Sequence, residues 1–135
     1  MHNSIVCILV LLTLFSTGCR STTENQVTEF NKGNFKIEVR SQEFNGSGTH
    51  NIDVCVVQSS SHAFPADKEQ CLMHGYDIDD LSVEWQSDRD VNISFNCGRI
   101  SSFRNYASVP VQGSSPVEFH AQLVDKCDTS KAASQ

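Results

Sequence analysis

Positive charge is scarce in this chain. Its 135 residues include 10 Lys and Arg against 16 Asp and Glu, which gives a formal net charge of −6 with histidine neutral. Proteins that hold a nucleic acid by attraction to its phosphates need a basic surface, and this composition offers none. We therefore expect no nucleic-acid partner.

Local catalytic motifs are also missing. His50, His62, His74 and His120 stand outside any nucleophile or metalloprotease motif, and the sequence Gly-x-Ser-x-Gly does not occur. Catalytic residues that are distant in sequence leave no local trace, so a hydrolase with a non-local site remains an alternative. We expect a protein that is not an enzyme.

Long apolar runs are limited to one segment. Residues 5–15, IVCILVLLTLF, suit the apolar region of a secretory signal but fall short of the about 20 residues that a membrane-spanning helix needs. The small residues Ser16, Thr17 and Gly18 follow, although no Lys or Arg precedes the run. We predict that residues 1–18 are a signal peptide.

The segment that ends at Cys19 resembles the lipobox of bacterial lipoproteins, in which the cysteine is diacylated and becomes the new N-terminus. Ser16 stands where that motif usually has Leu, and Arg20 follows the cysteine. The resemblance implies lipidation of Cys19, with chains such as palmitate, and attachment to the outer membrane facing the periplasm. The alternative is an ordinary signal peptide and a secreted or periplasmic soluble protein.

Six cysteines are present, of which Cys7 lies in the leader and Cys19 is assigned to lipid. The remaining four form an even number, as expected for two disulfides in an exported chain. They are Cys55, Cys71, Cys97 and Cys127. Three connectivities are open, and we favour Cys55 with Cys71 and Cys97 with Cys127, because each pair would join the ends of neighbouring strands.

A metal site is the alternative for Cys71, which precedes His74 at a ligand-like spacing. The other three cysteines stand alone, whereas structural zinc sites usually present paired ligands. An acidic segment lacks the ligand spacing of a calcium loop. Its carboxylates are Asp77, Asp79, Asp80, Glu84, Asp88 and Asp90. We expect a solvated acidic edge, no metal and no cofactor.

Alternating apolar and polar residues predict short strands through most of the remaining chain. In one example Phe35, Ile37 and Val39 would face inward, with Lys36 and Glu38 on the polar face. Similar patterns cover residues 52–57, 81–85, 91–95 and 117–123, and a short apolar piece at 71–75 would form a partner strand. Residues 98–109 are expected to form another strand with a bulge or bend, because Ile100 and Phe103 do not alternate simply. We predict an all-β fold, a small antiparallel sandwich or open barrel of about six to eight strands with two disulfides.

The expected domain organisation has three parts after the leader. Residues 19–32 would be a lipid-anchored polar tether, because this segment has little apolar content. Residues 33–127 would form the β domain, and residues 128–135 a loose tail.

Residues 79–123 resemble a group of small bacterial lipoproteins for which no activity is established. The shared pattern is Asn-Leu-x-Val-x-Trp, an Asp turn, Arg-Ile-x-x-Phe-x-Asn-Tyr and a closing Val-Glu-Ile-Arg-Leu strand; this chain has DLSVEWQ, RISSFRNY and VEFHAQL. The resemblance implies an exported lipoprotein with an all-β fold. The chain departs from the pattern at Ala107, where an aromatic residue is usual, and in its additional cysteines.

The most specific part of this pattern supplies the candidate binding residues. Arg99, Arg104, Asn105 and Tyr106 carry groups suited to binding carboxylates, sugars or a protein loop. The alternative is that the arginines pair with neighbouring acids and Tyr106 packs at a strand end.

Together these features predict an envelope lipoprotein whose β domain binds another macromolecule, either a protein or another envelope component. A specific version is a periplasmic inhibitor or immunity protein against an envelope-acting toxin or lysozyme, by analogy of fold alone.

Overall fold

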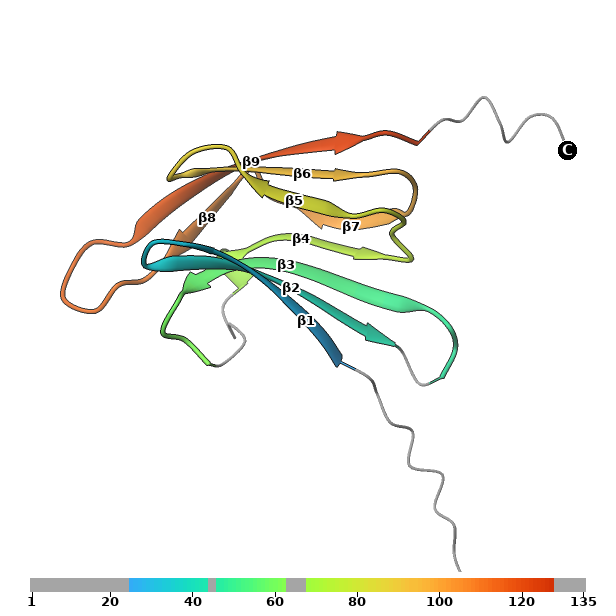
Figure 1. Ribbon diagram of the computed structural model, residues 1–135, viewed down its shortest axis with the longest axis horizontal. Helices are drawn as coiled ribbons and strands as arrows, with labels where there is room; N and C mark the ends of the chain where they lie inside the picture. Colours follow the sequence, from blue (N-terminus) through green and yellow to red (C-terminus); the bar gives the residue numbers. More distant parts are fainter. Residues whose placement is uncertain (1–24, 44–45, 63–67, 128–135) are drawn as a thin grey trace, which may run out of the picture.

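The computed structural model describes residues 25–43, 46–62 and 68–127, which form two β-sheets (Figure 1). The five-stranded sheet has the order β1-β2-β3-β4-β7, with bounds β1 Asn25–Lys32, β2 Phe35–Glu43, β3 His50–Gln58, β4 Cys71–Tyr76 and β7 Arg99–Phe103. The four-stranded sheet has the order β5-β6-β9-β8, with bounds β5 Ser82–Trp85, β6 Asp90–Phe95, β8 Tyr106–Val109 and β9 Val117–Asp125. A short 3-10 helix, η1 Lys68–Gln70, precedes β4.

The two sheets form a sandwich, which confirms the predicted all-β fold class (Figure 1). Its strand pairs are antiparallel except for β6 and β9, which are parallel. Parallel neighbours need a long connection. Here the chain between β6 and β9 visits the five-stranded sheet as β7 and returns as β8, so the crossover consists of strands.

The core lies between the sheets, where the inward positions of both are apolar. Phe119 of β9 is fully buried, and its ring meets those of Phe35 and Trp85 edge to face, at centroid distances of 4.8 Å and 5.7 Å. Burial of one such ring stabilises the fold by about 1.5–3 kcal/mol. Ile37 and Ile93 are also fully buried, in agreement with the predicted alternation.

Strand β1 moves the start of the domain from residue 33 to Asn25. We expected residues 19–32 to be a tether, but Asn25–Lys32 pairs with β2 along its whole length. The sequence gives only a weak signal for this strand. In the structure Val27 is 47% exposed, and Phe30 packs against the core while only partly buried. Pairing with β2 and a hydrogen bond of 3.0 Å from Trp85 Nε1 to the carbonyl of Phe30 hold this edge strand.

Both favoured disulfides are present. Cys55–Cys71 joins facing positions of β3 and β4, and Cys97–Cys127 joins the residues that follow the parallel strands β6 and β9. The cysteines are 16 and 30 residues apart in sequence, so in the chain-entropy model each bond stabilises the fold by about 3–4 kcal/mol.

The strand ends define two ends of the sandwich. Figure 1 shows the start of β1 and the end of β9 on one side, at the right, and the β1–β2, β5–β6 and β8–β9 connections on the opposite side. We call the second side the hairpin end. Lys32 at the close of β1 pairs with Asp88 of the β5–β6 turn at 3.6 Å, which places that turn at the hairpin end.

Candidate functional site

The four predicted binding residues fall on two sheets. Arg99 begins β7, whereas Asn105 and Tyr106 stand at the start of β8. Five residues of extended chain separate Arg99 from Arg104 by roughly 16 Å. The backbone N–H of Arg104 donates to the carbonyl of Leu72 at 2.8 Å, at the point where the chain leaves the five-stranded sheet. The structure keeps Asn105 and Tyr106 together and places Arg99 elsewhere.

Arg99 has an acidic neighbour, as the alternative interpretation of the sequence expects. Its Nη2 lies 3.6 Å from Oδ2 of Asp77, and its side chain is 78% exposed. An ion pair so open to solvent contributes little to stability. Arg99 also faces Tyr76 across the β4–β7 pair, and both line a hollow of about 420 Å³.

Asn105 and Tyr106 lie beside a row of exposed side chains on the four-stranded sheet. Asp90, His120 and Tyr106 occupy facing positions on the adjacent strands β6, β9 and β8. The carbonyl of Asn105 accepts a hydrogen bond of 2.8 Å from the N–H of Ala121, which fixes Asn105 at the same level.

Asp90, Asn105 and His120 line a hollow of about 560 Å³, which we call the β9 hollow, and Tyr106 lies beside it, facing His120. Its lining combines amide, hydroxyl, imidazole and carboxylate groups with two residues that are buried in the core, Val91 and Ala121. The lining residues are Gln86, Ser87, Asp90, Val91, Asn105, His120, Ala121 and Gln122. It is a polar site in the size range of about 300–1,000 Å³ that is typical of ligand pockets.

The β5–β6 turn forms one fixed rim of the β9 hollow. The Ser87 hydroxyl donates to the Asp90 carboxylate and accepts from the N–H groups of Arg89, at 3.1 Å, and Asp90, at 3.0 Å. The N–H of His120 donates to the carbonyl of Arg89 at 2.7 Å, which ties the turn to β9. These hydrogen bonds within the protein therefore fix the position of the β5–β6 turn.

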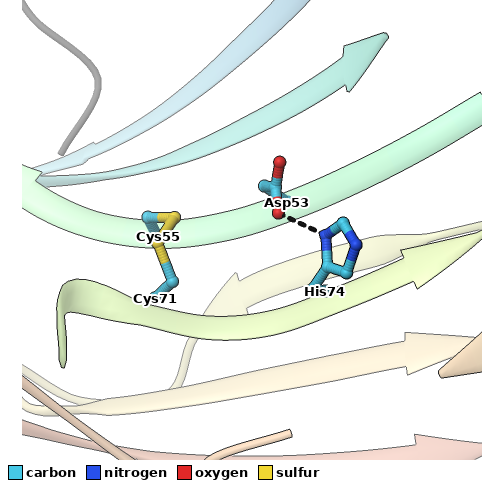
Figure 2. Close-up of a disulfide and its surroundings, with 4 residues drawn as sticks. All are labelled: Asp53, Cys55, Cys71 and His74. Atoms are coloured by element: carbon cyan, nitrogen blue, oxygen red, sulfur yellow. Dashed lines mark hydrogen bonds and ion pairs between the residues drawn. A yellow bond between two sulfur atoms is a disulfide. The ribbon is translucent and has the colours of Figure 1, made fainter. Parts of the chain in front are cut away.

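A second constellation lies on the five-stranded sheet, next to the Cys55–Cys71 disulfide (Figure 2). Nδ1 of His74 lies 2.6 Å from Oδ1 of Asp53, and Nε2 lies 3.2 Å from the hydroxyl of Tyr76. About a third of each side chain of the Asp53–His74 pair is exposed. A carboxylate on Nδ1 orients an imidazole and selects its tautomer, as in hydrolytic triads.

Strand register creates this arrangement. His74 faces Asp53 on β3, and it faces Ser102 on β7. The register shifts on both sides of β4: Leu72 is the extra residue beside Cys55, and Ser101 is the extra residue opposite Gly75. Nε2 of His74 contacts the phenol of Tyr76, whereas a serine nucleophile would have to occupy that position in a triad.

From the sequence, His74 is a ligand candidate with Cys71 and one of four histidines that a non-local hydrolase site could use. The sulfur of Cys71 is bonded to Cys55, so it cannot serve as a thiolate ligand. Across residues 25–43, 46–62 and 68–127 there is no cluster of three or more His, Cys, Asp or Glu side chains placed to hold a metal ion. His50, His62 and His120 are exposed.

Two charged residues of the five-stranded sheet are buried, although the alternation of the sequence predicts that they face solvent. Lys36 and Glu38 are each 4% exposed. Nζ of Lys36 lies 2.6 Å from Oε1 of Glu29 and 3.0 Å from Oε1 of Glu38. Hydrogen bonds to Glu29 and Glu38 raise the pKa of Lys36 above 10.5, although burial opposes the rise. The pattern predicted the face of these residues correctly but not their burial.

Carboxylates of the acidic segment accept hydrogen bonds that stabilise turns. Oδ1 of Asp77 accepts from the N–H of His50 at 3.0 Å, and Oδ2 of Asp80 accepts from Nδ2 of Asn96 at 2.5 Å. Both aspartates have positive φ angles, 48° and 49°, in the chain between β4 and β5. These carboxylates have structural partners as well as solvent exposure.

A third hollow, of about 480 Å³, opens at the hairpin end between the sheets. Phe35, Gln58, Val111 and Val117 are among its lining residues. Nε2 of Gln58 donates to the carbonyl of Pro110 at 2.6 Å, which links β3 to the β8–β9 connection.

Residues 1–18, Cys19 and the tail 128–135 lie outside the described residues. In the described part of the chain, no helix is long and apolar enough to cross a membrane.

Comparisons with family models, curated proteins and solved structures found no match to this chain.

Proposed function

We propose that this protein is a bacterial envelope lipoprotein whose disulfide-linked β-sandwich binds another macromolecule without catalysing a reaction. The observation that carries the binding role is that Asn105 lines the β9 hollow together with Asp90 and His120, while Tyr106 faces His120 on the adjacent strand. Two of the four binding residues suggested by the sequence thus meet groups from other strands at one place.

The disulfides support the proposed location. Cys55–Cys71 and Cys97–Cys127 are typical of chains that fold in an oxidising compartment such as the periplasm. With these four cysteines paired and Cys7 in the expected leader, Cys19 is left over, which fits lipidation at the lipobox-like segment. Two or more acyl chains would give lasting membrane attachment.

The position of β1 bears on how an anchored domain would be presented. Asn25 follows Cys19 by six residues, so an extended chain spans at most roughly 22 Å between them. An anchor at Cys19 would keep the start of β1 near the lipid surface. The hairpin end, with the β5–β6 turn that borders the β9 hollow, is then the end presented away from the membrane.

Location is tested by incorporation of labelled palmitate in a bacterial host. We expect label in the original protein and in Cys7→Ser, which changes the other cysteine of the N-terminal segment, and none in Cys19→Ser. Equal labelling of both variants, or no label in any of the three proteins, would contradict lipidation at Cys19.

Binding is tested by photo-crosslinking in cells with a photoreactive phenylalanine at Tyr106 or at Val27. The two side chains are 49% and 47% exposed and lie on different sheets, which makes Val27 a matched control. We expect an adduct of defined mass from position 106 that is absent from position 27. Adducts of the same kind at both positions, or none at position 106, would contradict the proposal.

The inhibitor or immunity protein is the protein-binding version of this proposal. In that version the adduct at position 106 would contain a toxin or a lysozyme. An adduct without any polypeptide would exclude this version and retain the broader one.

A hydrolase is the second candidate, favoured by the 2.6 Å contact between Asp53 and His74. Its test is hydrolysis of p-nitrophenyl esters by the purified protein, by His74→Gln and by His50→Gln. A rate lost only in His74→Gln would support this candidate. Equal rates in all three proteins would exclude a role for His74 in ester hydrolysis.

A further inference from the structure

We propose that the β9 hollow binds a neutral saccharide, such as a segment of an envelope glycan. This inference rests on the proposed function, since it names the chemical class of the macromolecule that the same site would bind. It follows from the groups that line the hollow, from their charge and from the exposed ring beside it.

The lining suits a ligand rich in hydroxyl groups. Asn105 and Gln122 each offer an amide that both donates and accepts hydrogen bonds, and the imidazole of His120 adds a further donor or acceptor. Among the described residues, these three side chains make no hydrogen bond to the protein. Their hydrogen-bonding capacity is therefore available to a ligand.

The charge of the lining favours neutral saccharides over anionic ones. Asp90 is the one formally charged residue that lines the hollow, since the other lining side chains are amides, a hydroxyl, an imidazole and apolar groups. Arg89, next to Asp90 in sequence, directs its guanidinium toward the carbonyl of Glu118 at 3.3 Å and over the ring of Phe119. A phosphate or a uronic acid would meet a carboxylate without a cation, so a neutral sugar fits better.

An apolar element suits the carbon-bound faces of a sugar ring. Tyr106 faces His120 across the β8–β9 pair and remains 49% exposed. An exposed phenol ring beside a polar hollow offers a flat apolar face together with a hydroxyl group.

A peptide is the competing ligand, and the hollow suits it less well. Peptide anchors are usually large aromatic or aliphatic side chains that enter desolvated pockets. Here most of the lining residues are polar, and the two apolar ones, Val91 and Ala121, are buried in the core. The hollow thus offers hydrogen bonds spread over a broad surface and lacks a deep apolar slot.

The test is a titration of the purified protein, labelled for NMR, with neutral tetrasaccharides of N-acetylglucosamine, glucose and mannose. We expect at least one of them to shift the signals of Asn105, His120 and Gln122 in a saturable manner. Tetragalacturonate, an anionic tetrasaccharide, should leave them unchanged. Binding of the anionic probe alone, or no saturable shift with any neutral probe, would overturn the inference.

Variants then locate the site. Removal of one ligand hydrogen bond in Asn105→Ala or Gln122→Ala should weaken binding by about fivefold to tenfold. Gln112→Ala is the matched control, because Gln112 is an exposed amide in the β8–β9 connection outside the hollow. Unchanged affinity in both hollow variants would contradict the assigned site, even with a bound sugar.

This titration can fail separately from the proposed function. A specific adduct at Tyr106 without saccharide binding would retain a macromolecule-binding domain and overturn only the choice of ligand. Saccharide binding that depends on Asn105 and Gln122, found without palmitate on Cys19, would support the proposed ligand and contradict the proposed lipid anchor.

Discussion

Nδ1 of His74 lies 2.6 Å from Oδ1 of Asp53, across facing positions of β4 and β3. The contact links two strands that the Cys55–Cys71 disulfide also joins, and Figure 2 shows the two linkages next to each other. About a third of each side chain reaches solvent, and the contact joins β3 to β4 beside the disulfide.

The first prediction concerns the coupling between these two residues. In a double-mutant cycle with Asp53→Asn and His74→Gln, we expect an interaction energy of about 1 kcal/mol, the usual size for a hydrogen bond of this exposure. The measurement is urea unfolding of the four proteins. A parallel cycle of Asp53→Asn with His50→Gln should be additive, because His50 does not contact Asp53 through its side chain in the described structure. Additivity in the first cycle would contradict a stabilising pair.

The second prediction concerns the buried charges. Lys36→Met leaves the carboxylate of Glu38 buried without its cation and should destabilise the fold by about 3 kcal/mol. The double variant Lys36→Met with Glu38→Leu should recover most of this loss. Lys32→Met is the control and should cost less than about 1 kcal/mol, since its pair with Asp88 is exposed. A double variant as unstable as the single one would contradict the expected role of the ion pair.

The raised pKa of Lys36 predicts that the stability of the fold depends on pH in the alkaline range. Because the folded state raises the pKa of Lys36 above 10.5, its stabilising effect is complete below that value and is lost as pH rises through the higher, folded pKa. Urea unfolding of the original protein and of Lys36→Met should therefore converge in free energy at strongly alkaline pH. A constant difference across that range would show that Lys36 acts through packing alone.

The third prediction concerns Gly75, at the register shift of β4. A Cβ atom there would lie 2.8 Å from the carbonyl of Arg99 and 2.6 Å from Cδ1 of Ile78. Gly75→Ala should therefore force β4 and β7 apart and destabilise the fold by about 1–3 kcal/mol. Ser101→Ala, at an exposed position of β7, is the control. Thermal unfolding checks both variants, and unchanged stability in Gly75→Ala would mean that the strands separate without cost.

Much of the sandwich is predictable from the sequence, because alternation records which face of a strand is buried. Phe35, Ile37 and Val39 pack on the core as expected, and the cysteine pairs follow from strands being neighbours. Strand β1 escapes this reasoning. An edge strand can form by pairing its backbone with a neighbour, and Val27 carries no sign of burial.

The candidate sites are harder to predict because they depend on register and on sheet order. The extra residue at Leu72 sets the offset between β3 and β4, so sequence spacing alone does not predict that His74 faces Asp53. The parallel pairing of β6 and β9 brings Asp90 beside His120, and local alternation contains no trace of it. Asn105 and Tyr106 were identified from a sequence pattern, whereas their neighbours became visible only in the fold.

The most direct test of the account is the intact mass of the protein isolated from bacterial membranes, measured without reduction. A chain that begins at Cys19, carries a diacylglycerol group and lacks the four hydrogens lost in forming Cys55–Cys71 and Cys97–Cys127 is the predicted result. An unmodified N-terminus at another residue would contradict the lipoprotein assignment.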